Sequence, residues 1–110
     1  MSDTDLVFYV TLTVKPDRVE DWKAAVFEVI GEMQHEDAFV SCYMHQDSRA
    51  PNVFTLYERW REPSVEAFVE HQTKPYRVAY DAKLPDLLER PREPAVLTPI
   101  REWHKATQAG

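Results

Sequence analysis

Two kinds of hydrophobic periodicity follow one another along the chain in a fixed order, and this order restricts the fold more than any other feature. Apolar residues at every second position predict β-strands, and apolar residues three and four apart predict amphipathic helices. Predicted strands cover residues 6–14, 38–46, 53–60 and 95–103, and predicted helices cover residues 17–36, 65–72 and 76–89. The order β-α-β-β-α-α-β predicts the ferredoxin-like split βαβ fold of the α+β class, with helices on one face of a four-stranded antiparallel sheet.

Polar residues and prolines set the expected boundaries of these elements. Asp17, with Glu20 three residues later, has the pattern of a capping box at the start of the first helix. Pro63 fits the first turn of the next helix, and Pro85 predicts a kink or a break in the last one. Pro99 cannot donate a backbone hydrogen bond, so we expect the fourth strand to be bulged there or to lie at a sheet edge.

Both faces of the predicted sheet carry apolar or aromatic residues. In the second strand, Phe39 and Tyr43 alternate with Cys42 and Met44. Helices on one face would leave the other face bare, and an exposed apolar sheet needs a second cover. A homodimer that packs sheet against sheet supplies this cover. The pattern therefore predicts a homodimer.

Length and charge restrict the class of protein. The 110 residues predict a single domain, 1–110, with a core at residues 6–103 and a tail at residues 104–110. The net charge is −6 and no basic run is present, which argues against nucleic-acid binding. The acidic start and the lack of a long apolar run predict a cytoplasmic protein that does not associate with membranes.

Cofactor and metal motifs are missing from the sequence. Two glycines cannot build a Gly-rich dinucleotide loop, and the four histidines and the single cysteine show no metal-ligand spacing. We therefore expect neither a metal nor a bound dinucleotide. Cys42 cannot form an internal disulfide, and its apolar neighbours predict a buried small hydrophobe.

The third strand and the short helix after it carry the candidate catalytic residues. His71 is either a half-solvated residue at a helix C-terminus or a general base in a cleft. Glu58 lies on an apolar strand face, where a carboxylate needs a partner or its pKa rises. It would form a salt bridge to an arginine such as Arg59 or Arg101, or it would position His71 or a substrate hydroxyl.

Aromatic residues near this segment are candidates for substrate binding. Trp60 and Phe68 are either core aromatics or the walls of a flat pocket for an aromatic ligand. Tyr9, Tyr43, Tyr57, Tyr76 and Tyr80 could add hydroxyl donors to such a pocket, although packing is the simpler role for each of them.

This segment resembles the antibiotic biosynthesis monooxygenase family of dimeric α+β barrels. The matching residues are Phe54, Leu56, Glu58 and Trp60 on the strand, Phe68 and His71 on the helix, and Thr73, Pro75 and Tyr76 after it. The resemblance extends over residues 6–103 and includes the order of the strands and helices.

The resemblance implies a homodimer with a cleft between helices and sheet in each protomer. It also implies oxygenation of a quinol or a polycyclic phenol by O₂ without flavin, haem or metal, because the substrate supplies the electrons. The protein would bind a flat aromatic substrate, remove a proton and stabilise the resulting anion. His71 would then act as the base, oriented by Glu58 and a tyrosine.

Other functions remain open at this point. A second branch of the family isomerises a phosphorylated metabolite, and Lys74, Arg77 and Lys83 could bind such a phosphate in an isomerase or binding protein. A third branch degrades haem with an asparagine on the first strand, where this chain has Tyr9 and Thr11. A non-catalytic stress-response dimer with a vestigial cleft is the last alternative.

Overall fold

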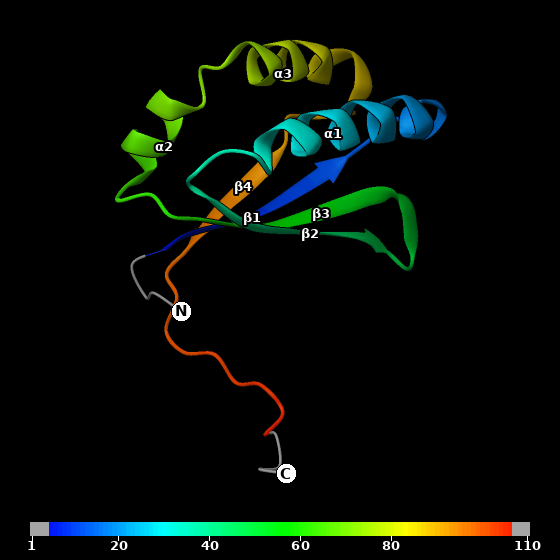
Figure 1. The fold of residues 1–110 in the computed structure, drawn as a ribbon. Coiled ribbons are helices and arrows are strands. Elements are labelled where there is room, and N and C mark those ends of the chain that lie inside the picture. Colours follow the sequence, from blue (N-terminus) through cyan, green and yellow to red (C-terminus); the bar gives the residue numbers. More distant parts are fainter. Residues whose placement is uncertain (1–4, 107–110) are drawn as a thin grey trace.

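Three helices cover one face of a four-stranded antiparallel sheet in the computed structural model, which describes residues 5–106 (Figure 1). The strands are β1 (Leu6–Thr13), β2 (Phe39–Asp47), β3 (Ala50–Trp60) and β4 (Glu93–Leu97). The helices are α1 (Val19–Met33), α2 (Val65–His71) and α3 (Pro75–Leu87), with a short 3₁₀ turn (Pro16–Arg18) before α1. The sheet order is β2-β3-β1-β4. This topology confirms the predicted ferredoxin-like α+β fold.

The core lies between the inner face of the sheet and the helices. On β1, Phe8, Val10 and Leu12 are buried toward the helices because side chains alternate along a strand. Trp22 and Val26 on α1 are 0% exposed and pack onto the same core. The alternation read from the sequence therefore decides which face of β1 is buried, and the sheet order makes β1 an inner strand.

The outer face of the sheet carries a row of tyrosines. Tyr9 pairs with Tyr57 across β1 and β3, and Tyr57 pairs with Tyr43 across β3 and β2. These three side chains are 42%, 38% and 58% exposed, in that order. The helices formed by residues 5–106 lie on the opposite face, so within this part of a single chain the aromatic face is in contact with solvent (Figure 1).

The two helix starts differ from the expected ones. The capping box at Asp17 is wrong, because Pro16 opens a 3₁₀ turn and α1 begins only at Val19, without a side-chain cap. Pro63 lies before α2 rather than in its first turn. Ser64 caps this helix instead, and its Oγ accepts a hydrogen bond of 3.1 Å from the backbone N–H of Ala67.

Three further boundaries are corrected by the structure. The turn between β2 and β3 contains only two residues, so β3 begins at Ala50 rather than at residue 53. α3 continues through Pro85 to Leu87 without a break. Only the last part of the helix follows this proline, so few helical hydrogen bonds depend on it. β4 runs at the sheet edge over Glu93–Leu97 and ends before Pro99, which cannot donate to a ladder.

Replacing the cap of α2 is expected to destabilise the fold. Ser64→Ala should lower the free energy of unfolding by about 1 kcal/mol, because the N–H of Ala67 loses its acceptor. Urea denaturation followed by circular dichroism measures this change. Ser48→Ala in the exposed hairpin turn is the control and should stay within about 0.5 kcal/mol of wild type. Equal stabilities of the two variants would show that the cap contributes nothing.

Candidate functional site

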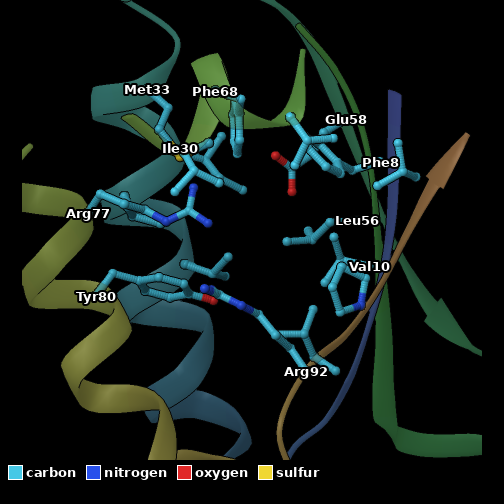
Figure 2. A pocket seen from close by; sticks show the side chains of 17 residues that line it. Phe8, Val10, Ile30, Met33, Leu56, Glu58, Phe68, Arg77, Tyr80 and Arg92 are labelled. Carbon is cyan, nitrogen blue, oxygen red and sulfur yellow. The ribbon is translucent and has the colours of Figure 1, made fainter. Parts of the chain in front are cut away.

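A cavity of about 270 Å³ lies between the inner face of the sheet and the helices (Figure 2). Its walls are mainly apolar and come from β1, β3, β4 and all three helices. The exposed side chains of Val69 on α2 and Val96 on β4 belong to its lining and mark its mouth. Four polar side chains also line it, namely Glu58, Arg77, Tyr80 and Arg92.

Glu58 is a buried carboxylate in the wall of this cavity. It alternates with Leu56 and Trp60 along β3, so it lies on the inner face of the sheet with only 7% of its surface exposed. Its Oε1 accepts a hydrogen bond of 3.0 Å from Nε1 of Trp60. Burial raises the pKa of Glu58, while the Trp60 bond and the charges of Arg77 and Arg92 oppose this shift. A carboxyl group of this kind accepts a proton more readily than an exposed one.

The raised pKa of Glu58 also predicts how stability depends on pH. The folded state binds the Glu58 proton more tightly than the unfolded state, where the pKa is near 4.5. Stability from this group is therefore fully present below pH 4.5 and is lost as the pH rises through the folded-state pKa. Glu58→Gln cannot ionise. Urea denaturation at several pH values should show wild type losing stability relative to this variant across that window. A constant difference would contradict a raised pKa.

Trp60 is hydrogen-bonded to Glu58 and lies in the core, outside the cavity lining. It is 0% exposed, and its ring packs against Phe39 and Phe68 with centroid distances of 5.2 Å and 5.0 Å. Phe68 itself lines the cavity and lies 4.8 Å from the ring of Phe8. The partner of Glu58 is therefore the Trp60 indole. Arg59, considered as its salt-bridge partner, pairs instead with Asp5 and Glu102.

Two arginines face Glu58 across the cavity. Nε of Arg77 lies 3.3 Å from Oδ1 of Asp81, and NH1 of Arg92 lies 2.9 Å from the same oxygen. The guanidinium of Arg77 also stacks near Phe68, 6.0 Å from the ring centroid. Figure 2 shows the Arg77 guanidinium and the Glu58 carboxylate turned toward the middle of the cavity, and the Arg92 side chain running across its lower part toward Tyr80. A proton acceptor and two cationic groups therefore share one largely apolar space.

Tyr80 adds a neutral hydroxyl to the cavity. Its oxygen accepts a hydrogen bond of 3.1 Å from Nε1 of Trp22, which is fully buried. Burial raises the pKa of Tyr80, so the hydroxyl keeps its proton. Because the indole occupies the oxygen as an acceptor, the O–H is free to donate to a ligand.

His71 lies outside this cavity. Its Nδ1 is 2.9 Å from Oε2 of Glu62, and its side chain is 57% exposed while that of Glu62 is buried. Both residues line a separate, open hollow near Lys74. The expectation that Glu58 positions His71 is not met, because the adjacent carboxylate is that of Glu62. Phe68 occupies the side of α2 that faces the cavity, and His71 ends that helix.

Four of the five candidate tyrosines also lie elsewhere. Tyr9, Tyr43 and Tyr57 are on the outer face of the sheet. The hydroxyl of Tyr76 donates to Oε2 of Glu36, whose other oxygen accepts from Lys74 at 2.7 Å. Of the nine residues proposed from the sequence, Glu58, Phe68 and Tyr80 line the cavity, and Trp60 supports Glu58.

Sequence reasoning gave incomplete roles to the residues opposite Glu58. Arg77 appeared only as a candidate phosphate ligand, and Tyr80 only as one of several candidate hydroxyl donors. Their spacing with Asp81, three and four residues apart, places the three on neighbouring positions of one helix face and could have linked them. Arg92 lies in a connection without periodicity, so no local pattern gives its direction. Lys83 lines a different surface hollow.

Cys42 behaves as a structural residue. It is partly buried and packs against the core, and burial followed by the charge of Glu58 raises its pKa to about 12. A thiol with this pKa stays protonated near neutral pH. Within residues 5–106, no group of three or more His, Cys, Asp and Glu side chains is arranged to hold a metal ion. No helix in that part of the chain combines the length and apolar character needed to cross a membrane.

The fold and the site together define the class of protein: a ferredoxin-like α+β domain with a ligand-sized cavity between sheet and helices. Residues 6–83 match the family model described as antibiotic biosynthesis monooxygenase. The chain therefore belongs to the antibiotic biosynthesis monooxygenase family.

Proteins of known structure share this fold. The chain is similar to Rv0793 from Mycobacterium tuberculosis, at 26% identity and a TM-score of 0.78, over 89% of this chain and 97% of that one. It also resembles PA3566 from Pseudomonas aeruginosa, at 20% identity and a TM-score of 0.78, over 89% and 96% of the two chains. An uncharacterized Synechocystis protein, sll1783, is 30% identical over 92 residues, or 84% of this chain. The matched part spans 61% of that relative's length.

Proposed function

We propose that this protein is a cofactor-independent monooxygenase that oxygenates a quinol or a polycyclic phenol inside the cavity. The observation that carries this proposal is the buried Glu58 carboxylate, which faces Arg77 and Arg92 across an apolar space. Family membership supports the reaction class. Geometry favours Glu58 over His71 as the base, because Glu58 lines the cavity and His71 does not.

Proton removal is the step that this site would catalyse. A substrate hydroxyl placed against Glu58 gives its proton to the carboxylate, whose pKa burial has raised toward that of a useful general base. The resulting oxyanion lies near two guanidinium groups in an apolar surrounding, where electrostatic stabilisation is strong. The Tyr80 hydroxyl can donate a further hydrogen bond to it.

Oxygen then reacts with the electron-rich anion. The anion passes one electron to O₂, and the two radicals combine to a carbon–oxygen bond. The peroxide breaks its O–O bond and releases water. For a quinol, one O₂ therefore yields one hydroxyquinone and one water. The substrate supplies all four electrons that reduce O₂, so the balance requires no further reductant.

The size of the cavity restricts the range of substrates that can bind. Its volume of about 270 Å³ lies just below the roughly 300–1,000 Å³ typical of small-molecule sites. A substrate with one or two fused rings fits this space better than a larger polycyclic one.

Oxygen uptake tests the proposal directly. Purified protein in an oxygen electrode, with a naphthalene diol such as 1,4-naphthohydroquinone, should consume one O₂ per quinol faster than the protein-free reaction. Mass spectrometry should find one oxygen atom from ¹⁸O₂ in the product. A rate equal to the protein-free control, or hydrogen peroxide in place of labelled product, would contradict monooxygenation.

A second candidate is an isomerase or binding protein for a small phosphorylated metabolite. The pair Arg77 and Arg92 in the cavity is the observation that favours it, because guanidinium groups bind phosphate well. Calorimetric titration with a sugar phosphate tests it. Heat of binding that disappears in Arg92→Gln would support this candidate, and the absence of binding would contradict it.

We also propose that the protein is a homodimer in which the outer faces of two sheets meet. The row Tyr43, Tyr57 and Tyr9 supports this arrangement, since it would otherwise remain exposed. Light scattering should give twice the chain mass of 12.9 kDa at micromolar concentration. Tyr57→Lys should shift the mass toward the monomer, because it places a charge at the centre of the interface. Phe27→Lys, on the exposed side of α1, should leave the dimer intact. A wild-type monomer would contradict the proposal.

A further inference from the structure

Two arginine side chains project into a cavity whose walls are otherwise mainly apolar. Arg77 lies on α3, and Arg92 lies in the connection that precedes β4. Their side chains are only 16% and 30% exposed. A cation turned away from water and into an apolar space has lost part of its solvation, and an anionic ligand restores it.

The two positive charges of these arginines outnumber the carboxylates that they contact. Both guanidinium groups contact the same oxygen of Asp81, at 3.3 Å and 2.9 Å. One carboxylate therefore contacts two cations, so the group of Arg77, Arg92 and Asp81 has one positive charge in excess, and this excess faces Glu58 across the cavity. Each guanidinium has five N–H donors. Within residues 5–106, Arg77 uses two of them, on Asp81 and Gln72, and Arg92 uses one.

We propose that the ligand of this cavity is a hydroxylated aromatic carboxylate, whose carboxylate binds Arg77 and Arg92 while its ring hydroxyl lies against Glu58. This inference rests on the proposed function and adds a charged substituent to the substrate. Guanidinium groups bind carboxylates through paired, charge-assisted hydrogen bonds. A carboxylate carries one negative charge, which matches the single net positive charge. A phosphate carries about 1.5 to 2 negative charges at pH 7 and would repel Glu58 more strongly.

Such a ligand would also be held in one orientation. The arginines come from α3 and the following connection, and Glu58 comes from β3, so the two anchoring points lie on opposite sides of the cavity (Figure 2). The ring between them would pack against Phe8 and Phe68. Two fixed polar contacts place the hydroxyl at the proton acceptor, which is the alignment that catalysis requires.

Binding of the ligand carboxylate would also raise the proton affinity of Glu58. In the ligand-free protein the charges of Arg77 and Arg92 lower the proton affinity of Glu58 and partly offset its burial. A ligand carboxylate neutralises these charges, so the proton affinity of Glu58 rises when the substrate binds. A general base works best when its pKa lies near the working pH.

Calorimetric titration under argon tests the inference without turnover. The ligands are 6-hydroxy-2-naphthoate, its neutral isostere 6-hydroxy-2-naphthamide, and 2-naphthyl phosphate. Wild type is expected to bind the hydroxynaphthoate at least about 10-fold more tightly than the amide. Arg92→Gln should reduce this preference to about threefold or less, and Arg77→Gln with Arg92→Gln should abolish it. Lys83→Gln is the matched control, because Lys83 lies on α3 but lines a different hollow, and it should keep the full preference.

Three results would overturn the inference: equal affinities of wild type for the acid and the amide, a preference that persists in the double arginine variant, or tighter binding of the phosphate than of the acid. The comparison of acid and amide on wild type needs no substitution, so it tests the inference even where a variant fails to fold. Oxygen uptake is measured separately. A protein that prefers the hydroxynaphthoate but consumes no O₂ supports the carboxylate site and contradicts only the oxygenase function.

Discussion

Glu58→Gln is expected to lower the kcat of quinol oxygenation by roughly 10²–10⁴-fold, the usual contribution of a general base. Glutamine keeps the size of the side chain, and its amide oxygen can still accept the hydrogen bond from Trp60. It cannot accept the substrate proton. An oxygen electrode at several quinol concentrations separates the effect on kcat from that on KM. The loss should fall mainly on kcat.

The pH profile and a His71 variant test whether Glu58, rather than His71, is the general base. In wild type, kcat/KM should rise with pH through the raised pKa of Glu58, because only the ionised carboxylate accepts a proton. Glu58→Gln should lack this rise. His71→Asn is the control and should change kcat less than about threefold, or under 1 kcal/mol of barrier, because His71 pairs with Glu62 outside the cavity. A large loss in His71→Asn with little loss in Glu58→Gln would make His71 the base.

Trp22→Ala is expected to lower the free energy of unfolding by about 3–5 kcal/mol, the range for removing a buried aromatic side chain. Trp22 is 0% exposed, and its ring lies 4.6 Å from that of Phe54. Its Nε1 donates to the buried hydroxyl of Tyr80, which would lose this partner. A domain of this kind is stable by only about 5–15 kcal/mol, so the variant should unfold at much lower urea concentration.

A substitution on the exposed side of the same helix provides the control. Phe27 lies on α1 and is 57% exposed, so Phe27→Ala should stay within about 0.5 kcal/mol of wild type. Trp22→Phe should lie between Trp22→Ala and wild type, because it keeps most of the ring but loses the bond to Tyr80. A loss below 1 kcal/mol in Trp22→Ala would contradict a packing role for this residue.

The order and type of the elements could be predicted because they depend on local patterns. Strand alternation on β1 and helical spacing on α1 each bury one set of side chains, and both were read from the sequence. Boundaries were less predictable. The start of α1 depends on the 3₁₀ turn that Pro16 opens, and the end of β4 depends on which residues pair with β1. A short segment of sequence does not encode which distant strand it pairs with.

The candidate site was predictable in part for the same reason. Alternation along β3 placed Glu58 on an apolar face, so a carboxylate that either has a partner or has a raised pKa was expected. The partner considered was an arginine, whereas the fold supplies the Trp60 indole from the same strand. The link between His71 and Glu58 came from the family resemblance. In the fold the carboxylate beside His71 is that of Glu62.

The sequence by itself determined the ferredoxin-like fold, the apolar inner face and the presence of Glu58 on that face, because hydrophobic periodicity decides which side chains leave water. Tertiary structure decided what Glu58 faces. Arg77 reaches the cavity from α3, and Arg92 reaches it from a connection without periodicity. Their convergence depends on how α3 packs over the sheet and on where the chain turns into β4. Long-range packing sets such contacts, and no local spacing encodes them.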